Sequence, residues 1–309
     1  MTFALVCGII QKTTYKGTKY RKGVIMKNFK RFFTLVIAAL LIVSVIPIIN
    51  SDAKTDYLSS FKVSKKTIYK GNGVAISVDK ATKGSGYVDI TFVVKNNSDK
   101  DYDIAAHEYA INNLMAGGSA YMSDVNVPSG KKARFTVSIN KEWFKNNGIK
   151  TFKKFDVLFW GYGESMKEWE SPKVSFSTNK DNGKGYFKPK KAAKVSDENI
   201  DIGYISKKSD KYKFYVKNKT ERERRWTVEN CSVNGWSFDL GSAKYDLYSE
   251  PILNGCYAVF EIPVDKDFKS ENSIKKIKEI EFDIEFEGGF DDDYNNIEEI
   301  KSDKIKIKL

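Results

Sequence analysis

The sequence predicts an all-β protein, in which two tandem antiparallel β-sandwiches follow an N-terminal signal or anchor helix. Three observations support this prediction: apolar residues that alternate along short segments, a repeat that spans both halves of the chain, and an apolar run near the N-terminus. The 309 residues are 41% hydrophobic, 14% aromatic and 30% charged, with only six prolines. This composition can bury two ordinary cores, and it excludes a disordered chain, a coiled coil and a protein embedded in a membrane over most of its length.

Residues 26–53 have the order of features that an export signal requires. A basic start at Met26 is followed by an apolar run over residues 32–49 and by small residues that predict cleavage after Ala53. Residues 1–25 look unlike a targeting segment and are interpreted as an upstream mis-start. The apolar run could also remain in the membrane as an anchor, and both alternatives place the rest of the chain outside the cell or at its surface.

One unit occurs twice in the sequence. The spacing between matching segments is 122 residues at first, then 125 and finally 131, so insertions of three and six residues in the second copy explain the drift. The matches are Val94–Lys100 with Val216–Arg222, Ile111–Asn113 with Val233–Gly235, Gly130–Ile139 with Gly255–Val264, Phe155–Phe159 with Ile280–Ile284, and Ser171–Phe176 with Ser302–Ile307. We therefore expect each copy to form one sandwich.

Apolar and polar residues alternate in four segments of the first copy, and clusters of Gly, Asn, Asp and Ser separate them. The segments are Val74–Val78, Tyr87–Val94, Phe135–Ile139 and Phe155–Phe159. They predict six or seven short antiparallel strands per copy, each with one buried face. Asn140 can cap a short helical turn that ends at Gly148, and Asp265 takes the comparable place in the second copy. We expect Trp143 and Phe268 to pack over the ends of the two cores.

Residues 179–199 lack a strand pattern and contain Gly183, Gly185 and Pro189, so they are interpreted as a linker. The linker divides a first sandwich at residues 54–178 from a second at 200–309. Its cluster of lysines could dock on an anionic wall polymer or lipid, or it could be a solvated spacer that repels itself. The cluster consists of Lys184, Lys188, Lys190, Lys191 and Lys194.

Two segments of the first copy are similar to a known kind of domain. In Val93–Asp99 a strand runs into an Asn-rich turn, and Val127–Lys132 precedes the next strand. With these segments the chain resembles the tandem immunoglobulin-like (telokin-like) sandwich domains of secreted proteins from low-GC Gram-positive bacteria. The resemblance covers most of residues 68–178 and, more faintly, 200–309. It implies an immunoglobulin-like fold and an exported location, and it implies no catalytic residue because such families mostly lack an assigned activity.

Cys231 and Cys256 are the two cysteines that follow the leader, and both belong to the second copy. Strand alternation directs both side chains into the core between facing strands. An exported protein can form a disulfide, so a bond between them is one alternative, and two buried thiols are the other. Their counterparts in the first copy are Tyr109 and Lys131, which means that the fold does not need the bridge.

No sequence motif identifies a catalytic centre. His107 is the only histidine, so a zinc site or a Ser-His-Asp triad would lack the partners it needs, and we expect a polar strand or loop residue there. An acidic pair can suffice for a glycan-cleaving enzyme. Because Asp and Glu occur in every turn, no pair stands out, and we name no catalytic residue.

Calcium is the one cofactor for which the sequence offers candidate ligands. Asp291, Asp293 and Asn295 have the every-other-residue oxygen spacing that begins a calcium loop. The pattern then fails, since Asn296 stands where the loop needs Gly and Ser302 where it needs a bidentate Glu. The alternative is a solvated acidic hairpin tip.

Trp160, Tyr162 and Trp236 are candidate sugar-binding residues, because a flat apolar ring can stack on the C–H face of a sugar. Trp160 and Tyr162 lie in a hairpin with two glycines, and Trp236 follows a tight turn at Asn234 and Gly235. The alternative is that these rings pack in the core or at its rim.

These observations predict an exported, non-catalytic binding module of the bacterial cell surface or medium. A carbohydrate-binding accessory protein is the alternative, and a glycan-cleaving enzyme is a third hypothesis. The expected partner is a cell-envelope protein or polysaccharide, with membrane contact only through an uncleaved leader. Without residues 1–53 the chain has 44 basic and 39 acidic side chains, a balance that does not indicate nucleic-acid binding.

Overall fold

Strands make up 57% and helices 5% of the residues that the structure describes, which confirms the predicted predominance of β-structure. The computed structural model describes residues 56–117, 120–121, 124–164, 166–190, 193–240, 251–287 and 300–309. The predicted leader at residues 26–53 and the calcium candidates Asp291, Asp293 and Asn295 lie outside these ranges. In the described ranges, no helix combines the length and apolar character that a membrane crossing needs.

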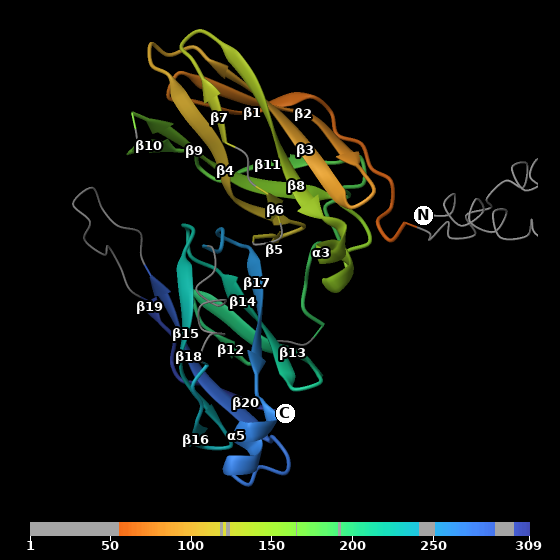
Figure 1. Cartoon of the computed structure of the whole chain (residues 1–309), viewed down its shortest axis with the longest axis vertical. Helices are drawn as coiled ribbons and strands as arrows, with labels where there is room; N and C mark the ends of the chain where they lie inside the picture. The colour runs from red at the N-terminus through yellow and green to blue at the C-terminus, as the bar shows by residue number, and fades with distance from the viewer. Residues whose placement is uncertain are drawn as a thin grey trace, which may run out of the picture. The chain divides into compact units, whose positions relative to one another are not determined.

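The first half of the described chain forms a sandwich-like pair of sheets (Figure 1). One sheet has the order β1 (Lys66–Gly71), β2 (Val74–Lys83), β3 (Tyr87–Asn96), β8 (Lys132–Asn140) and β6 (Ala120–Tyr121). The facing strands have the order β10 (Met166–Glu170), β9 (Lys154–Gly163), β4 (Tyr102–Ile111) and β5 (Leu114–Met115), with β7 (Asp124–Val127) beside β4 and β11 (Val174–Ser177) beside β9. Buried side chains of both layers share one core.

The second half repeats this arrangement. Strands β12 (Val195–Ser196), β13 (Ile200–Lys208), β14 (Lys211–Asn218) and β17 (Tyr257–Pro263) form one layer. The other layer has the order β16 (Trp236–Ser237), β15 (Arg225–Val233), β18 (Glu279–Glu287) and β19 (Ile300–Lys301), with β20 (Ile305–Lys308) also paired to β18. A second core lies between these layers.

One sheet continues from the first half into the second, which the sequence analysis did not anticipate. Strand β5 pairs in parallel with β17 at Leu114 and Tyr257, so that ten strands form a single sheet. The backbone N–H of Tyr257 donates a hydrogen bond of 2.8 Å to the carbonyl of Asn113. The expectation of purely antiparallel sheets is therefore wrong at this point, because the open edge of β5 takes a partner from the other half.

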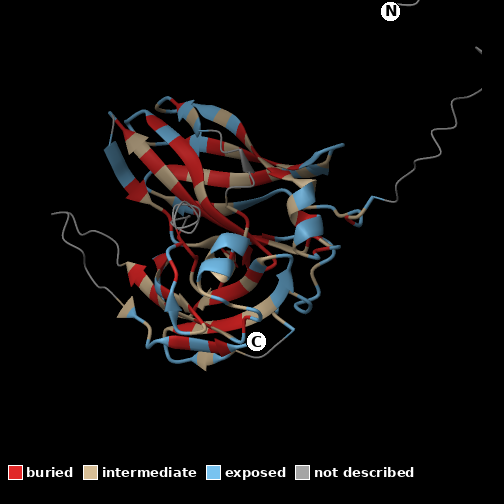
Figure 2. Ribbon diagram, turned by 60° about the horizontal axis from the view of Figure 1, so that its bottom comes forward, coloured by how far each residue is buried: buried red, intermediate tan, exposed pale blue. Residues whose placement is uncertain are grey.

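Central strands of the shared sheet are buried on both faces. Figure 2 shows the usual alternation of buried and exposed residues along most strands. In β4 and β9, by contrast, Ala110 and Leu158 belong to the second core although their neighbours in sequence belong to the first. The two halves thus cover each other's apolar surface, and the predicted linker takes part. Phe187 packs against the first core, and its ring lies 5.4 Å from that of Tyr257, so this stretch is not a free spacer.

Matching residues of the repeat make the same hydrogen bonds. The side-chain amide of Asn96 donates to the carbonyls of Lys100 and Val127, and its oxygen accepts from the backbone N–H and the hydroxyl of Ser98. Asn218, 122 residues later, donates to the carbonyls of Arg222 and Ile252 and accepts from the backbone N–H and hydroxyl of Thr220. Both asparagines are fully buried. The predicted register of the repeat is confirmed at these positions.

The same equivalence holds at the short helices. Helix α3 (Lys141–Asn146) begins at Asn140, whose side chain accepts from a backbone N–H, and α5 (Lys266–Glu271) begins in the same way at Asp265. Both caps were predicted from the sequence. Trp143 and Phe268 pack against the first and the second core respectively, as expected.

Candidate functional site

Two equivalent hairpins have the same internal structure. In hairpin β4–β5 the two turn residues, Asn112 and Asn113, have φ angles of 51° and 67°, and in hairpin β15–β16 Asn234 and Gly235 have φ angles of 52° and 83°. Two-residue hairpins require this left-handed backbone, which Asn and Gly tolerate best. Asn112 and Asn234 also anchor their turns in the same way, each by one donated and two accepted hydrogen bonds to a neighbouring backbone segment. The tight turn predicted before Trp236 is thus confirmed.

The surroundings of the two hairpins differ. Leu114, the first residue after the first turn, is only 1% exposed: its side chain belongs to the first core, and its backbone pairs with β17 at Tyr257. Trp236 occupies the equivalent position after the second turn and is 53% exposed. Figure 1 shows β16 beside α5, at the end of the second half opposite β5. Close to Trp236, Phe238 is buried against Phe268 with ring centroids 4.8 Å apart.

The ring of Trp160 is covered on both faces. The ring of His107 stacks on it with a centroid distance of 3.4 Å and an interplanar angle of 12°. Nζ of Lys167 lies 4.5 Å from the centroid of the same ring, and since His107 occupies one face, Lys167 must occupy the other. Tyr162 is partly buried with its ring 6.0 Å from that of Trp160. The structure therefore brings Trp160 and Tyr162 together, but Trp236 lies elsewhere.

His107 belongs to β4, in agreement with its predicted place in a strand or loop. Its Nδ1 lies 2.7 Å from Oε1 of Glu108, a buried carboxyl group. Burial, assisted by the positive charges of Arg225 and Lys167, lowers the pKa of His107 to about 4. The imidazole is therefore neutral at physiological pH and serves as a packing partner for Trp160.

Glu170 and Glu223 form an acidic pair that joins the two halves. Burial and the neighbouring Glu170 raise the pKa of Glu223, and a hydrogen bond connects the two carboxyl groups. Glycan-cleaving enzymes hold their carboxyl groups about 5 Å or more apart so that the sugar or a water fits between them. A directly hydrogen-bonded pair leaves no such space.

Cys231 and Cys256 are both buried in the second core as free thiols. Burial raises the pKa of each thiol to about 12. This arrangement corresponds to the second of the two alternatives that the sequence offered. For metals, the described residues contain no group of three or more His, Cys, Asp or Glu that could hold an ion.

A groove of about 780 Å³, here called the basic groove, lies in the described part of the chain. It is lined by residues between Asn146 and Lys153, by residues 185–190, and by side chains of the second half that include Ser206 and Lys213. Of its lysines, only Lys188 and Lys190 belong to the cluster that the linker sequence indicates. The other lysines escaped notice because they are distant in sequence and stand in no cluster.

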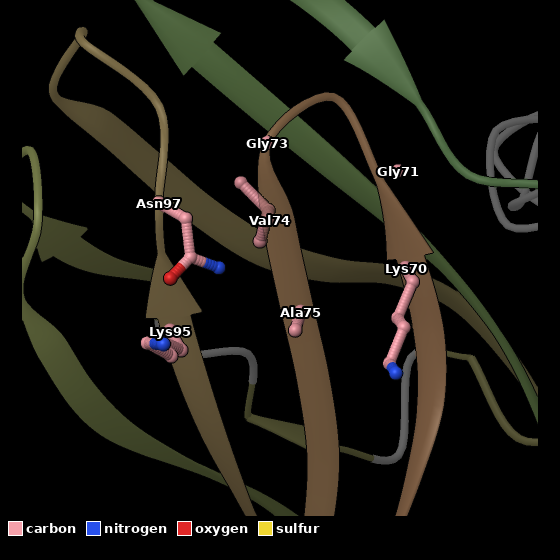
Figure 3. Close-up of a pocket in the computed structure, with 7 residues that line it drawn as sticks. All are labelled: Lys70, Gly71, Gly73, Val74, Ala75, Lys95 and Asn97. Atoms are coloured by element: carbon pink, nitrogen blue, oxygen red, sulfur yellow. The ribbon is translucent and has the colours of Figure 1, made fainter.

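A smaller pocket of about 480 Å³ lies beside the β1–β2 turn. Figure 3 shows that its two lysines, Lys70 and Lys95, come from the strands on either side of β2. The remaining lining residues are Gly71, Gly73, Val74, Ala75 and Asn97. It offers two ammonium groups and no aromatic ring, so it has fewer groups that could contact a ligand than the basic groove has.

No family model and no curated protein sequence matches this chain. Among solved structures, a transglutaminase from red sea bream is 10% identical, with a TM-score of 0.22, over 78% of this chain and 32% of its own. The match thus spans about a third of the transglutaminase. A conserved domain protein from Bacillus anthracis is 12% identical, with a TM-score of 0.21, over 82% of this chain and 93% of its own. Similarities at this level support no functional assignment.

Proposed function

We propose that this protein is an exported, non-catalytic binding module of the bacterial cell surface or medium, built from two tandem immunoglobulin-like sandwiches. The difference between the two equivalent hairpins carries the proposal. Hairpin β4–β5 meets the other half of the same chain: Leu114, buried in the first core, pairs with Tyr257 of β17, and Met115 packs against the second core. Hairpin β15–β16 has the same construction but presents Trp236 to solvent. We infer that the second hairpin docks on a separate partner.

Physical considerations support Trp236 as a contact residue. A Trp that is half exposed leaves a large apolar area in water, and this area becomes favourable only when a partner covers it. The hydrogen bonds of Asn234 and the buried Phe238 hold the hairpin in place, so little conformational entropy is lost when a partner binds. Rigid aromatic residues of this kind dominate the binding energy of many interfaces.

A carbohydrate-binding accessory protein is the second candidate, and the exposure of Trp236 is compatible with it. A sugar site made of all three predicted residues is not supported, since His107 and Lys167 cover Trp160. Binding to sugar would then depend on Trp236 alone, which favours a protein partner. The hydrogen-bonded pair of Glu170 and Glu223 gives no support to a glycan-cleaving activity.

The proposal can be tested by co-sedimentation of purified residues 56–309 with isolated cell envelopes of a low-GC Gram-positive bacterium. We expect the parent to pellet and Trp236→Ala to bind at least about tenfold more weakly. Met166→Ala is the matched control, because Met166 is 66% exposed on β10, and it should bind like the parent. Failure of the parent to pellet, or equal binding by Trp236→Ala, would overturn the proposal.

Pretreatment of the envelopes separates the two candidate partners. Protease digestion should abolish binding if the partner is a protein, and periodate oxidation of sugar diols should leave it intact. The reverse pattern would identify a carbohydrate-binding protein with Trp236 in its site.

A further inference from the structure

The basic groove differs from the hairpin surface in position and in chemistry. Three separate segments line it: the chain that follows α3, the stretch at residues 185–190, and strand residues of the second half. Its volume of about 780 Å³ lies within the range of ligand-binding sites in proteins.

The side chains that line the groove are strongly biased in charge. Five are lysines and none is Asp or Glu; the lysines are Lys150, Lys153, Lys188, Lys190 and Lys213. The bias is local, because residues 181–309 as a whole contain 24 basic and 26 acidic side chains. Positive groups gathered in a concave site repel one another and attract anions.

Four of these lysines have no charge partner among the described residues. Salt bridges occupy many other lysines of the chain, for example Lys211 with Glu261 and Lys269 with Asp210, but not Lys150, Lys188, Lys190 or Lys213.

Lys153 is engaged differently. Its Nζ donates hydrogen bonds to Oδ1 of Asn182 and to the carbonyl of Lys184, which are neutral groups. The pKa of Asp181 is lowered overall. Burial acts to raise this pKa, but the hydrogen bonds that Asp181 accepts and the positive charge of Lys153 outweigh the effect of burial. Lys153 is thus partly compensated, and the other four ammonium groups provide the free positive charge.

The groove is held in its shape by bonds that do not involve the ammonium groups. The amide of Asn112 donates to the carbonyl of Thr151, and the carbonyl of Asn112 accepts from the backbone N–H of Phe187. Gly185 has a φ of 70°, and a Cβ at this position would lie 2.9 Å from Nζ of Lys153. A glycine therefore leaves space for the ammonium group, and the site is largely formed before a ligand arrives.

The residue types indicate which anions fit. The groove contains lysines and no arginine, so it offers point charges on flexible stems instead of the planar fork that grips one carboxylate or phosphate in two places. Ile149, Phe187 and Val259 add apolar surface between the charges. Such a lining suits a flexible chain with single negative charges at intervals along a C–H-rich backbone.

We propose that the basic groove binds a polyanionic chain, whose charges are phosphodiester or uronate groups. The groove would bind such a chain on a surface separate from Trp236. Its lysines lie in both halves, so a bound chain would also bridge them.

The test measures binding of purified residues 56–309 to three soluble polymers of similar length: poly(glycerol phosphate), polygalacturonate and neutral dextran. We expect one or both polyanions to bind, with an affinity that falls as salt rises, and dextran not to bind. The triple variant Lys150→Gln, Lys188→Gln, Lys190→Gln should bind at least about tenfold more weakly. The polyanion that binds more tightly identifies the charge group.

The control is a triple variant that removes the same charge elsewhere: Lys70→Gln, Lys95→Gln, Lys132→Gln. These three lysines are exposed, and two of them line the smaller pocket of Figure 3. The control should bind within about twofold of the parent. An equal loss of affinity in both triple variants would mean that net charge alone causes binding, and it would overturn the proposal. Binding of dextran as tight as that of the polyanions would also overturn it.

A second measurement uses the parent protein and needs no variant. Acetylation of lysines, mapped by mass spectrometry, should slow at Lys150, Lys188, Lys190 and Lys213 when the polyanion is present. Lys70, Lys95 and Lys132 should react at unchanged rates. Uniform protection of both sets would contradict a site in the groove.

Discussion

Trp160 and Trp236 differ in what surrounds their rings, and this difference predicts opposite effects on stability. Trp160 packs against the second core and is stacked on His107, so Trp160→Ala should lower the free energy of unfolding by about 3 kcal/mol. Trp236 is half exposed, so its removal exposes little buried surface. Trp236→Ala should change the free energy of unfolding by less than about 0.5 kcal/mol. Urea unfolding of residues 56–309 measures both. Equal losses would contradict the assignment of Trp236 as a contact residue.

The two cysteines give a prediction about thiol chemistry. As buried thiols with a pKa of about 12, Cys231 and Cys256 should not react with a thiol reagent at pH 8 in the native protein. Two thiols should react after denaturation without reductant, whereas a disulfide would yield none.

The raised thiol pKa values also have a consequence for stability. The unfolded chain loses thiol protons near pH 9, while the folded chain retains them until about pH 12. The contribution of the thiols is therefore complete below pH 9 and is lost as the pH rises above it. The double variant Cys231→Ala, Cys256→Ala should show a weaker decline in stability between pH 9 and 11. An identical decline would mean that other groups cause it.

For single residues, the sequence predicted whether a side chain points into the core better than it predicted which side chains it contacts. Alternation placed Cys231 and Cys256 in the core, and the turn at Asn234 and Gly235 was anticipated from residue type. Which ring covers Trp160 could not be predicted, because His107 lies far from it in sequence and meets it only through the pairing of β4 with β9.

At the level of structural elements, the buried asparagines connect each strand end to the loops beside it. Asn96→Ala would leave the carbonyls of Lys100 and Val127 without their donor, and Asn218→Ala would do the same in the second half. Each variant should lose about 2–3 kcal/mol of stability. Thermal or urea unfolding measures the loss, and Asn97→Ala, at an exposed neighbouring position, is the control with little expected effect.

A large difference between Asn96→Ala and Asn218→Ala would contradict the equivalence of the two networks. The sequence showed that these asparagines match in the repeat and precede a turn. It could not show that they are fully buried, since turn residues are usually exposed and only the fold supplies the four partners of each side chain.

At the level of the whole molecule, periodicity predicted the strands but not the sheet that they share. The pairing of Leu114 with Tyr257 depends on one edge strand meeting another, and edge strands of two halves have no sequence signature for each other. The same limitation applies to the basic groove. Its lysines come from three separate segments, at residues 150–153, at residues 188–190 and at Lys213. Local patterns thus define each half, whereas their junction arises from tertiary contacts.

The shared sheet predicts that the two halves unfold together. Phe187 contributes to this coupling because it packs on the first core and contacts Tyr257 of the second half. In the parent protein, hydrogen exchange of β3 and β14 should report the same free energy of opening, since neither half can unfold without exposing the face that it shares. Phe187→Ala should lower the stability by about 2 kcal/mol and separate the two values.

Phe61→Ala is the matched control for this variant. Phe61 packs against the same first core and contacts Phe152, but it takes no part in the contact with Tyr257. It should lower the stability of both halves together without separating their exchange. If β3 and β14 already exchange with different free energies in the parent, or if Phe61→Ala separates them as strongly as Phe187→Ala, the coupling does not pass through the ring contact. Coincident values in the parent that separate only in Phe187→Ala would establish this contact as the mechanical link between the halves.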